Sequence, residues 1–162
     1  MPPAGTMPPA GTMPALVMAA GRRSCALPVS HVAEIMRPLP IECVAGTPKY
    51  LLGLSVIRGS AVPVVDLGLV LDASVLDGKQ EPARRLVVVQ VGERRFALAV
   101  SSVVGVRGLE LQTLQRVPDL LRAPSTEYIE GFGATDQELM LLLAAARLVP
   151  EQVWSQLQAT AS

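Results

Sequence analysis

One arginine and one aspartate stand inside an otherwise apolar stretch, GLSVIRGSAVPVVDLG, which runs from Gly53 to Gly68. Burying an unpaired arginine is costly, so Arg58 is expected to reach solvent or to meet a partner. Two interpretations of Arg58 stay open: a solubilising residue at the tip of a hairpin, or a binding charge displayed on a rigid hairpin. For Asp66 we expect a structural role, in which its carboxylate accepts backbone N–H bonds at a strand end.

Few other residues could do chemistry. The chain has one histidine, His31, and two cysteines, Cys25 and Cys43, and their spacing does not form a zinc pattern. No nucleophile elbow, phosphate-binding loop or zinc-protease motif occurs. The segment GFGATD carries Asp136 where a dinucleotide loop needs its third glycine. We therefore predict no enzyme, no catalytic residue, no metal and no cofactor, with His31 structural and both cysteines free and buried.

The composition excludes several classes of partner. The formal net charge is zero and aromatic residues make up 3% of the chain, which argues against a nucleic-acid-binding barrel with a basic groove and stacking rings. No apolar run reaches the roughly 18 residues of a membrane-spanning helix, and no polybasic anchor is present, so no membrane insertion is expected. Half of the 162 residues are hydrophobic, which predicts elements covered on both faces.

The first residues differ from the rest of the chain. The hexapeptide MPPAGT occurs twice in succession, without charge and without a helix or strand period. We interpret residues 1–14 as a disordered Pro/Gly-rich tail and place the folded domain at residues 15–158. The segment does not resemble a signal peptide, because its apolar run is short and the arginine pair follows that run.

The elements that must position Arg58 are short strands joined by turns. Three hairpins are expected, around Gly21-Arg22, around Gly92-Glu93-Arg94 and around Thr135-Asp136-Gln137, and a helix is expected near the end of the chain, at 144–157. Helices do not alternate with the strands, so a parallel α/β fold is disfavoured. The pattern predicts an all-β barrel or pair of barrels.

The opening stretch itself reads as a hairpin with a two-residue turn. Gly59-Ser60 suits a type II′ turn, which would place Arg58 opposite Ala61 at the tip and leave both faces of the hairpin apolar and covered. Period-2 alternation in the earlier strand would turn Ile35 into the core and the two flanking residues, Glu34 and Met36, outward.

Several ordered motifs resemble the CheW-like coupling proteins of bacterial chemosensory systems. GLSVIRGSAVPVVDLG is similar to the family pattern G-x-x-x-x-R-G-x-x-x-P-V-x-D-L, and CALPVSHVAEIMRP is similar to its A-L-P-V-x-x-V-x-E-I entry segment. GTPKYLLG and the pair YIEGFG and LMLLL resemble further segments of the family. The resemblance covers nearly all of residues 15–150.

This resemblance implies a fold of two intertwined five-stranded SH3-like barrels with short helices, one of them at the C-terminus. It implies a non-catalytic cytoplasmic scaffold at membrane-associated receptor arrays, which couples the cytoplasmic tip of a methyl-accepting chemoreceptor to the regulatory domain of a CheA-type histidine kinase. Arg58, with Gly59 and Ile57, falls on the receptor-binding motif. Glu34 and Met36 fall near the kinase-binding surface, and the two partners are expected to use different faces.

Four positions depart from the family pattern. Val56 stands where many members have Asn, Ser101 where Asp is usual, Ala97 in place of Gly, and Ala144 where the last strand usually ends in Asp. An alternative therefore stays open: an adaptor of an auxiliary pathway, for example one serving surface motility, that binds receptor without kinase. A small β-barrel enzyme or a nucleic-acid-binding module is a further, less favoured alternative.

Overall fold

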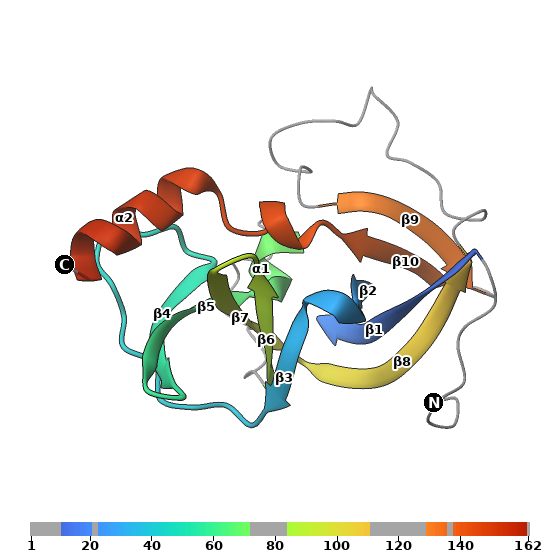
Figure 1. Cartoon of the computed structure of the whole chain (residues 1–162), viewed down its shortest axis with the longest axis horizontal. Coiled ribbons are helices and arrows are strands. Elements are labelled where there is room, and N and C mark those ends of the chain that lie inside the picture. Colours follow the sequence, from blue (N-terminus) through green and yellow to red (C-terminus); the bar gives the residue numbers. More distant parts are fainter. Residues whose placement is uncertain (1–10, 21–22, 72–83, 111–128, 136–137, 162) are drawn as a thin grey trace.

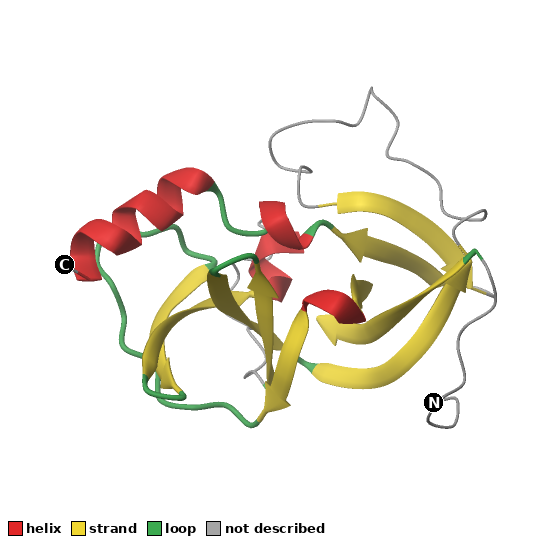
Figure 2. Cartoon of the chain, in the orientation of Figure 1, coloured by secondary structure: helices red, strands yellow, loops and turns green. Residues whose placement is uncertain are grey.

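The structure, a computed structural model, describes residues 11–20, 23–71, 84–110, 129–135 and 138–161 (Figure 1). Short strands dominate these residues (Figure 2). The elements in chain order are β1 Thr12–Ala20, β2 Arg23–Pro28, η1 Val29–His31, β3 Val32–Met36, β4 Leu51–Ile57, β5 Ser60–Asp66, α1 Leu67–Leu71, β6 Arg85–Val91, β7 Arg94–Val100, β8 Ser102–Glu110, β9 Ile129–Thr135, β10 Glu138–Leu143, η5 Ala145–Arg147 and α2 Glu151–Ala161.

The strands form two five-stranded sheets. One sheet has the order β8-β1-β2-β10-β9 and the other the order β3-β6-β7-β5-β4. The chain begins in the first sheet, builds the second with β3 to β7, and returns to the first with β8 to β10, so the two units are intertwined. Each sheet contains one parallel pair, β2 with β10 and β5 with β7, where the chain re-enters the sheet. The expected fold of two intertwined five-stranded β units with a C-terminal helix is confirmed.

The three expected hairpins are present. Their closing pairs are Ala20 with Arg23, Val91 with Arg94, and Thr135 with Glu138. Two elements were missed from the sequence: the long edge strand β8 and the one-turn helix α1. The C-terminal helix was expected at 144–157, but regular α-helix begins only at Glu151, because Pro150 occupies the start of the helix, where its missing N–H is tolerated.

The expected boundary of the N-terminal tail needs a correction. Strand β1 starts at Thr12, which pairs with Glu110 of β8, and Met13 and Pro14 continue the same ladder. Residues 12–14 therefore belong to the first sheet, because β8 supplies a partner strand that the local Pro/Gly-rich sequence does not reveal. Residues 1–10 of the proposed tail lie outside the described residues.

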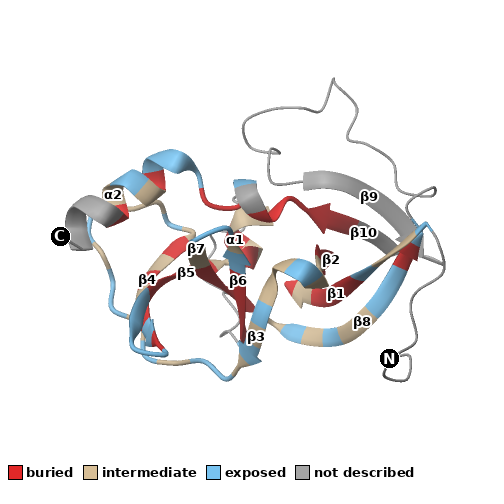
Figure 3. Cartoon of the chain, in the orientation of Figure 1, coloured by how far each residue is buried: buried red, intermediate tan, exposed pale blue. Residues whose placement is uncertain are grey.

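Three apolar clusters explain why so many strands are hydrophobic on both faces. The largest cluster, here called the shared cluster, lies between the two sheets and contains side chains from both. Each sheet also has a smaller cluster of its own, here called its inner cluster. In β6, Val87 and Val89 face the shared cluster, whereas Leu86 and Val88 face the inner cluster of their own sheet. The expectation that both faces of many strands are covered is confirmed for these central strands (Figure 3).

Helix α2 joins the shared core although it follows the last strand of the other sheet. Its residues Val153 and Leu157 are buried in the shared cluster. Trp154 packs edge-on against Phe96 of β7, with ring centroids 6.2 Å apart and an interplanar angle of 67°. Figure 1 shows α2 lying beside the end of the molecule that carries β4 and β5. The helix thus covers the second sheet and ties the C-terminus to it.

Polar contacts also hold α2 in its position on the second sheet. Arg94 of β7 makes two hydrogen bonds of 2.5 Å to the carboxylate of Glu151, and its guanidinium lies 5.2 Å from the centroid of the Trp154 ring. The hydrogen bonds from Arg94 lower the pKa of Glu151 below its ordinary value. One turn later, the Gln156 amide donates to the carbonyl of Gly46 at 2.8 Å.

Candidate functional site

The β4–β5 hairpin carries Arg58 at its tip, but its turn differs from the expected one. Ile57 pairs with Ser60, so the two turn residues are Arg58 and Gly59 rather than Gly59 and Ser60. Both have positive φ, 52° and 79°, as a type I′ turn requires. A non-glycine residue is unusual in this left-handed region. The type II′ prediction is therefore wrong, and Arg58 forms the turn itself.

Gly53 anchors the other end of the hairpin. Its φ is +146°, and a Cβ at this position would lie 2.0 Å from the carbonyl oxygen of Glu42. That close approach lets Glu42 and Leu54 exchange two backbone hydrogen bonds of 2.8 Å each. The glycine at the start of the Arg58 motif is thus required for the chain 37–50 to pack along the hairpin.

The corrected turn leaves the same side chains on each face of the hairpin. Ile57, Val62 and Val64 fill the inner cluster of the second sheet, whereas Val56 is 72% exposed. The expectation that both faces of the hairpin are covered is therefore wrong at its tip. Pro63 pairs with Leu54. The backbone N–H and C=O of Leu54 are both hydrogen-bonded to Glu42 instead, so the missing N–H of the proline leaves no backbone group of Leu54 without a partner.

Arg58 meets Glu34 of β3 in a two-point ion pair. Its Nη2 lies 3.1 Å from Oε1 of Glu34, and its Nε donates to Oε2 at 3.3 Å. The Arg58 side chain is 73% exposed and that of Glu34 is 25% exposed. The hydrogen bond and the charge of Glu34 raise the pKa of Arg58 above its already high ordinary value. The expected exposure of Arg58 at the tip of the hairpin is confirmed, and the ion pair gives Arg58 a partner that neither interpretation of its role included.

The alternation of side chains in β3 is the reverse of the expected one. Ile35 is 43% exposed, and Met36 packs against the inner cluster of the second sheet. The cause is an irregularity in the pairing with β6: Val32 pairs with Val89 but Glu34 with Val88. This bulge shifts the period by one residue, so the prediction of a buried Ile35 is wrong.

The structure brings together some of the predicted site residues and separates others. The turn residues Arg58 and Gly59 lie close to Glu34, although the two partners of Arg58 and Glu34 were expected to use different faces. Ile57 is 1% exposed and supports the hairpin from inside, so its side chain is not presented to a partner. Met36 is half-buried. The expectation of a fully covered hairpin missed the exposure of Val56, although Val56 lies two residues before Arg58 and stands where many family members have Asn.

The family departures fall mostly at structural positions. Ala97 is fully buried in the inner cluster, where it pairs with Val88. The backbone N–H of Ser101 bonds the carbonyl of Ala19, and Ala144 is buried and accepts a bond from the N–H of Arg147. Only Val56 lies on the hairpin with Arg58.

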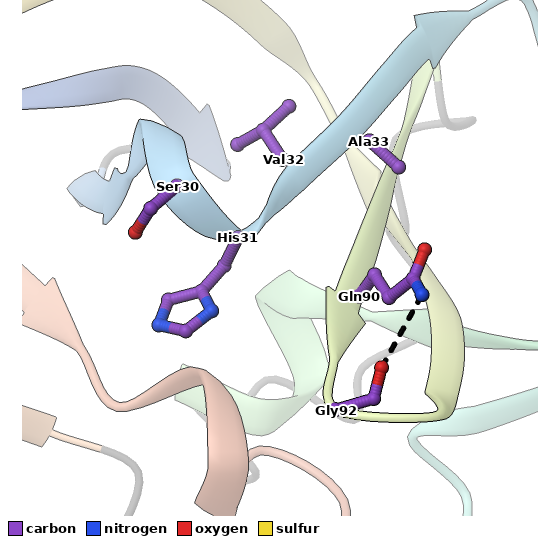
Figure 4. A pocket seen from close by; sticks show the side chains of 6 residues that line it. All are labelled: Ser30, His31, Val32, Ala33, Gln90 and Gly92. Carbon is purple, nitrogen blue, oxygen red and sulfur yellow. Dashed lines mark hydrogen bonds between the residues drawn. The ribbon is translucent and has the colours of Figure 1, made fainter.

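The residues suspected of metal or acid–base chemistry are dispersed. His31 lies half-buried on η1, at the edge of an open pocket of about 400 Å³ lined by Ser30, His31, Val32, Ala33, Gln90 and Gly92 (Figure 4). Its wall is closed by a hydrogen bond of 3.2 Å from Gln90 to the carbonyl of Gly92. Within the described ranges, no three metal-binding side chains come together.

The aspartate and the cysteines have structural settings. Oδ1 of Asp66 accepts a bond of 3.1 Å from the backbone N–H of Leu69, so the expected structural role is confirmed, at the start of α1. Both cysteines are free, as predicted, but Cys43 is exposed, because it lies in the open chain before β4. Cys25 is buried, and burial raises the pKa of its thiol to about 12.

The chain is similar to known proteins over most of its length. Residues 14–153 match the CheW-like domain family. The chain is 23% identical over 137 residues to "Chemotaxis protein CheW" of Klebsiella aerogenes, covering 85% of this chain and 81% of that one. It is 24% identical over 132 residues to "Probable chemotaxis protein CheW" of Rhizobium etli, covering 81% and 83%.

A solved structure shares the fold. The scaffolding protein TtCheW from Thermoanaerobacter tengcongensis superimposes with a TM-score of 0.74 at 20% identity, covering 88% of this chain and 95% of that one. No helix in the part of the chain that the structure describes is long and apolar enough to cross a membrane. The fold and the matched residues agree, and the chain belongs to the CheW-like domain family.

Proposed function

We propose that this protein is a non-catalytic scaffold that couples the cytoplasmic tip of a chemoreceptor to a CheA-type histidine kinase. The observation that carries the proposal is the presentation of Arg58: an exposed guanidinium in the turn of a hairpin whose body is buried. A charge held on such a rigid element loses little conformational freedom when it binds a partner.

The surroundings of Arg58 suit protein binding. Val56, two residues before it, adds exposed apolar surface, and the Glu34 carboxylate limits the rotation of the guanidinium. Arginine beside apolar surface is typical of the residues that dominate binding energy at protein interfaces. The scaffold proteins of this family are non-catalytic.

The ion pair has a consequence for the two partners. Arg58 was assigned to the receptor and Glu34 to the kinase, yet the two side chains are hydrogen-bonded to each other. A change at either residue alters the charge and orientation of the other. We therefore propose that the receptor- and kinase-binding surfaces adjoin at this pair, so that a change at Arg58 affects the binding of both partners.

The test is a pull-down of the purified protein with a receptor signalling tip and, separately, with the regulatory domain of the kinase. We expect capture by both and a loss of about tenfold or more in receptor affinity for Arg58→Glu. The matched control is Arg147→Glu, which reverses an exposed arginine near η5. Capture by receptor alone would favour the auxiliary adaptor, and capture by neither would overturn the proposal.

The place of action follows from the partners. If both bind, the protein works on the cytoplasmic side of the membrane at receptor arrays, without inserting into the membrane itself. Because the first strand begins at Thr12, the proposed domain runs from Thr12 to residue 158, and the proposed tail is limited to the residues before Thr12. Microscopy of a fluorescent fusion in cells with and without the receptors tests this: loss of polar or clustered signal without receptors is expected.

A further inference from the structure

Three exposed arginines gather at one end of the second sheet: Arg37, Arg84 and Arg85. Strand β3 ends at Met36, which pairs with Leu86, so Arg37 follows at the position opposite Arg85. Arg84 precedes Arg85 in the chain, and its backbone N–H bonds the carbonyl of Val100 at 3.1 Å. The start of β6 therefore carries Arg85, with Arg84 just before it, and the neighbouring strand β3 leads into Arg37.

This cluster is not neutralised by the described residues. Like charges at opposite positions of neighbouring strands destabilise a sheet. The two ion pairs found among the described residues involve Arg58 and Arg94, so neither reaches this cluster. The side chain of Arg85 donates a hydrogen bond of 2.7 Å to the backbone carbonyl of Arg84, which brings no negative charge. Arg58, in contrast, is paired with the carboxylate of Glu34.

An exposed apolar side chain lies beside the cluster. Ile35 is 43% exposed, and Arg37 follows the last residue of β3 two positions further on, where the next residue, Pro38, favours an extended backbone, so the two side chains are expected on the same side. Ile35 pairs with Val87, and Arg85 stands two residues before Val87 in β6. Ile35, Arg37 and Arg85 therefore share one side of the sheet. Glu34, which holds Arg58, belongs to the other side of β3.

We propose that Ile35, Arg37 and Arg85, here called the β3–β6 arginine surface, bind an acidic and partly apolar segment of a partner protein. Charge complementarity selects the acidic segment, because carboxylates pair with arginine in a two-point geometry. Ile35 supplies an apolar contact that a sugar-phosphate backbone does not use. The formal net charge of zero also argues against a nucleic acid, which is bound through an extended basic surface. The surface is separate from the Arg58 site, so its test does not depend on the proposed function.

The test uses fluorescence anisotropy with labelled probes at low and physiological salt. The acidic probe is a twelve-residue peptide in which glutamates surround two leucines, and the matched probe carries glutamine in place of glutamate. We expect the intact protein to bind the acidic probe about tenfold or more tightly than the glutamine probe. Arg37→Glu/Arg85→Glu should remove this preference, and Ile35→Ala should weaken binding of the acidic probe by about threefold.

The control is Arg107→Glu/Arg147→Glu, which reverses two exposed arginines outside the surface. The circular dichroism spectra of both double variants check that they fold. If the charge-reversed variants do not fold, Arg37→Gln provides a milder variant that removes one charge from the surface. Equal losses in the control and the cluster variants would overturn the proposal, since net charge alone would then explain binding. Tighter binding of a single-stranded oligonucleotide of equal charge would also overturn it, in favour of a nucleic acid.

Discussion

Arg58 and Glu34, 24 residues apart in sequence, form a two-point ion pair between the turn of the β4–β5 hairpin and the edge strand β3. The two strands that carry them, β4 and β3, lie at opposite edges of the second sheet. The ion pair therefore links the two edges at the tip of the hairpin. It also joins the two residues for which the sequence suggested different partners.

The charge swap Glu34→Arg/Arg58→Glu separates orientation from direct contact. If the positive charge of Arg58 itself meets the receptor, the swap keeps an ion pair but leaves receptor binding as weak as in Arg58→Glu. Affinity for the receptor tip, measured by titration calorimetry with both variants and the intact protein, provides the check. Recovery of binding in the swap would contradict direct contact and show that the pair acts by fixing the hairpin.

Ile35 and Ile57 should respond very differently to truncation. Ile35→Ala is expected to change the free energy of unfolding by no more than about 1 kcal/mol, because the side chain is 43% exposed. Ile57→Ala removes a side chain that is 1% exposed and should cost about 2–5 kcal/mol. Urea denaturation of both variants measures the difference. Similar costs at the two positions would mean that the β3 bulge is misplaced.

Gly53→Ala is expected to destabilise the protein by more than about 2 kcal/mol. The new Cβ would meet the backbone of Glu42, which cannot rotate away as a side chain could, and the φ of +146° disfavours alanine. Gly108→Ala is the control, because its Cβ would only reach ordinary contact with Thr12, 3.7 Å away. Thermal unfolding compares the two, and equal stability would refute the close approach of Glu42.

The two cysteines should differ in reactivity and in their effect on alkaline stability. A thiol reagent is expected to label Cys43 at once and Cys25 only in denaturant. Burial raises the pKa of Cys25 from 9.0 to about 12, so the folded state holds its proton more tightly. The protonated thiol therefore contributes to the free energy of unfolding in full below pH 9. This contribution is lost as the pH rises from 9 to 12, by at most about 1.4 kcal/mol per pH unit.

The variant Cys25→Ala isolates this pH dependence. Its unfolding free energy should be lower at neutral pH, because a buried side chain is shortened, but should fall less steeply than that of the intact protein between pH 8.5 and 10. Tyr50, whose pKa burial also raises, is present in both proteins and cancels in the comparison. Parallel curves for the two proteins would rule out a contribution from Cys25.

Helix α2 should behave as part of the core. Leu157→Ala is expected to cost about 2–5 kcal/mol, because Leu157 is 6% exposed within the shared cluster. Gln152→Ala, on the exposed side of the helix, should be nearly neutral. Trp154, the one tryptophan of the chain, reports docking of α2 by its fluorescence. A helix that detaches in a separate transition, before global unfolding, would contradict this.

The sequence by itself determined the local features. The three hairpins were predicted correctly because turn chemistry and apolar runs act over a few neighbouring residues, as in the pair Val91–Arg94. The abundance of apolar residues in β6 correctly indicated strands covered on both sides. The motif around Arg58, with its resemblance to CheW-like proteins, indicated the family, and the match over residues 14–153 confirms it.

The tertiary structure alone decided register and exposure. Arg58 adopts a left-handed conformation that no local rule favours for arginine, and the turn therefore falls one residue earlier than expected. The bulge after Val32 turned Ile35 outward, and pairing with β8 drew residues 12–14 into a sheet. A shift of one residue reverses every side chain of a strand at little local cost, so the choice depends on contacts between residues far apart in sequence, and these form only when the two sheets pack together.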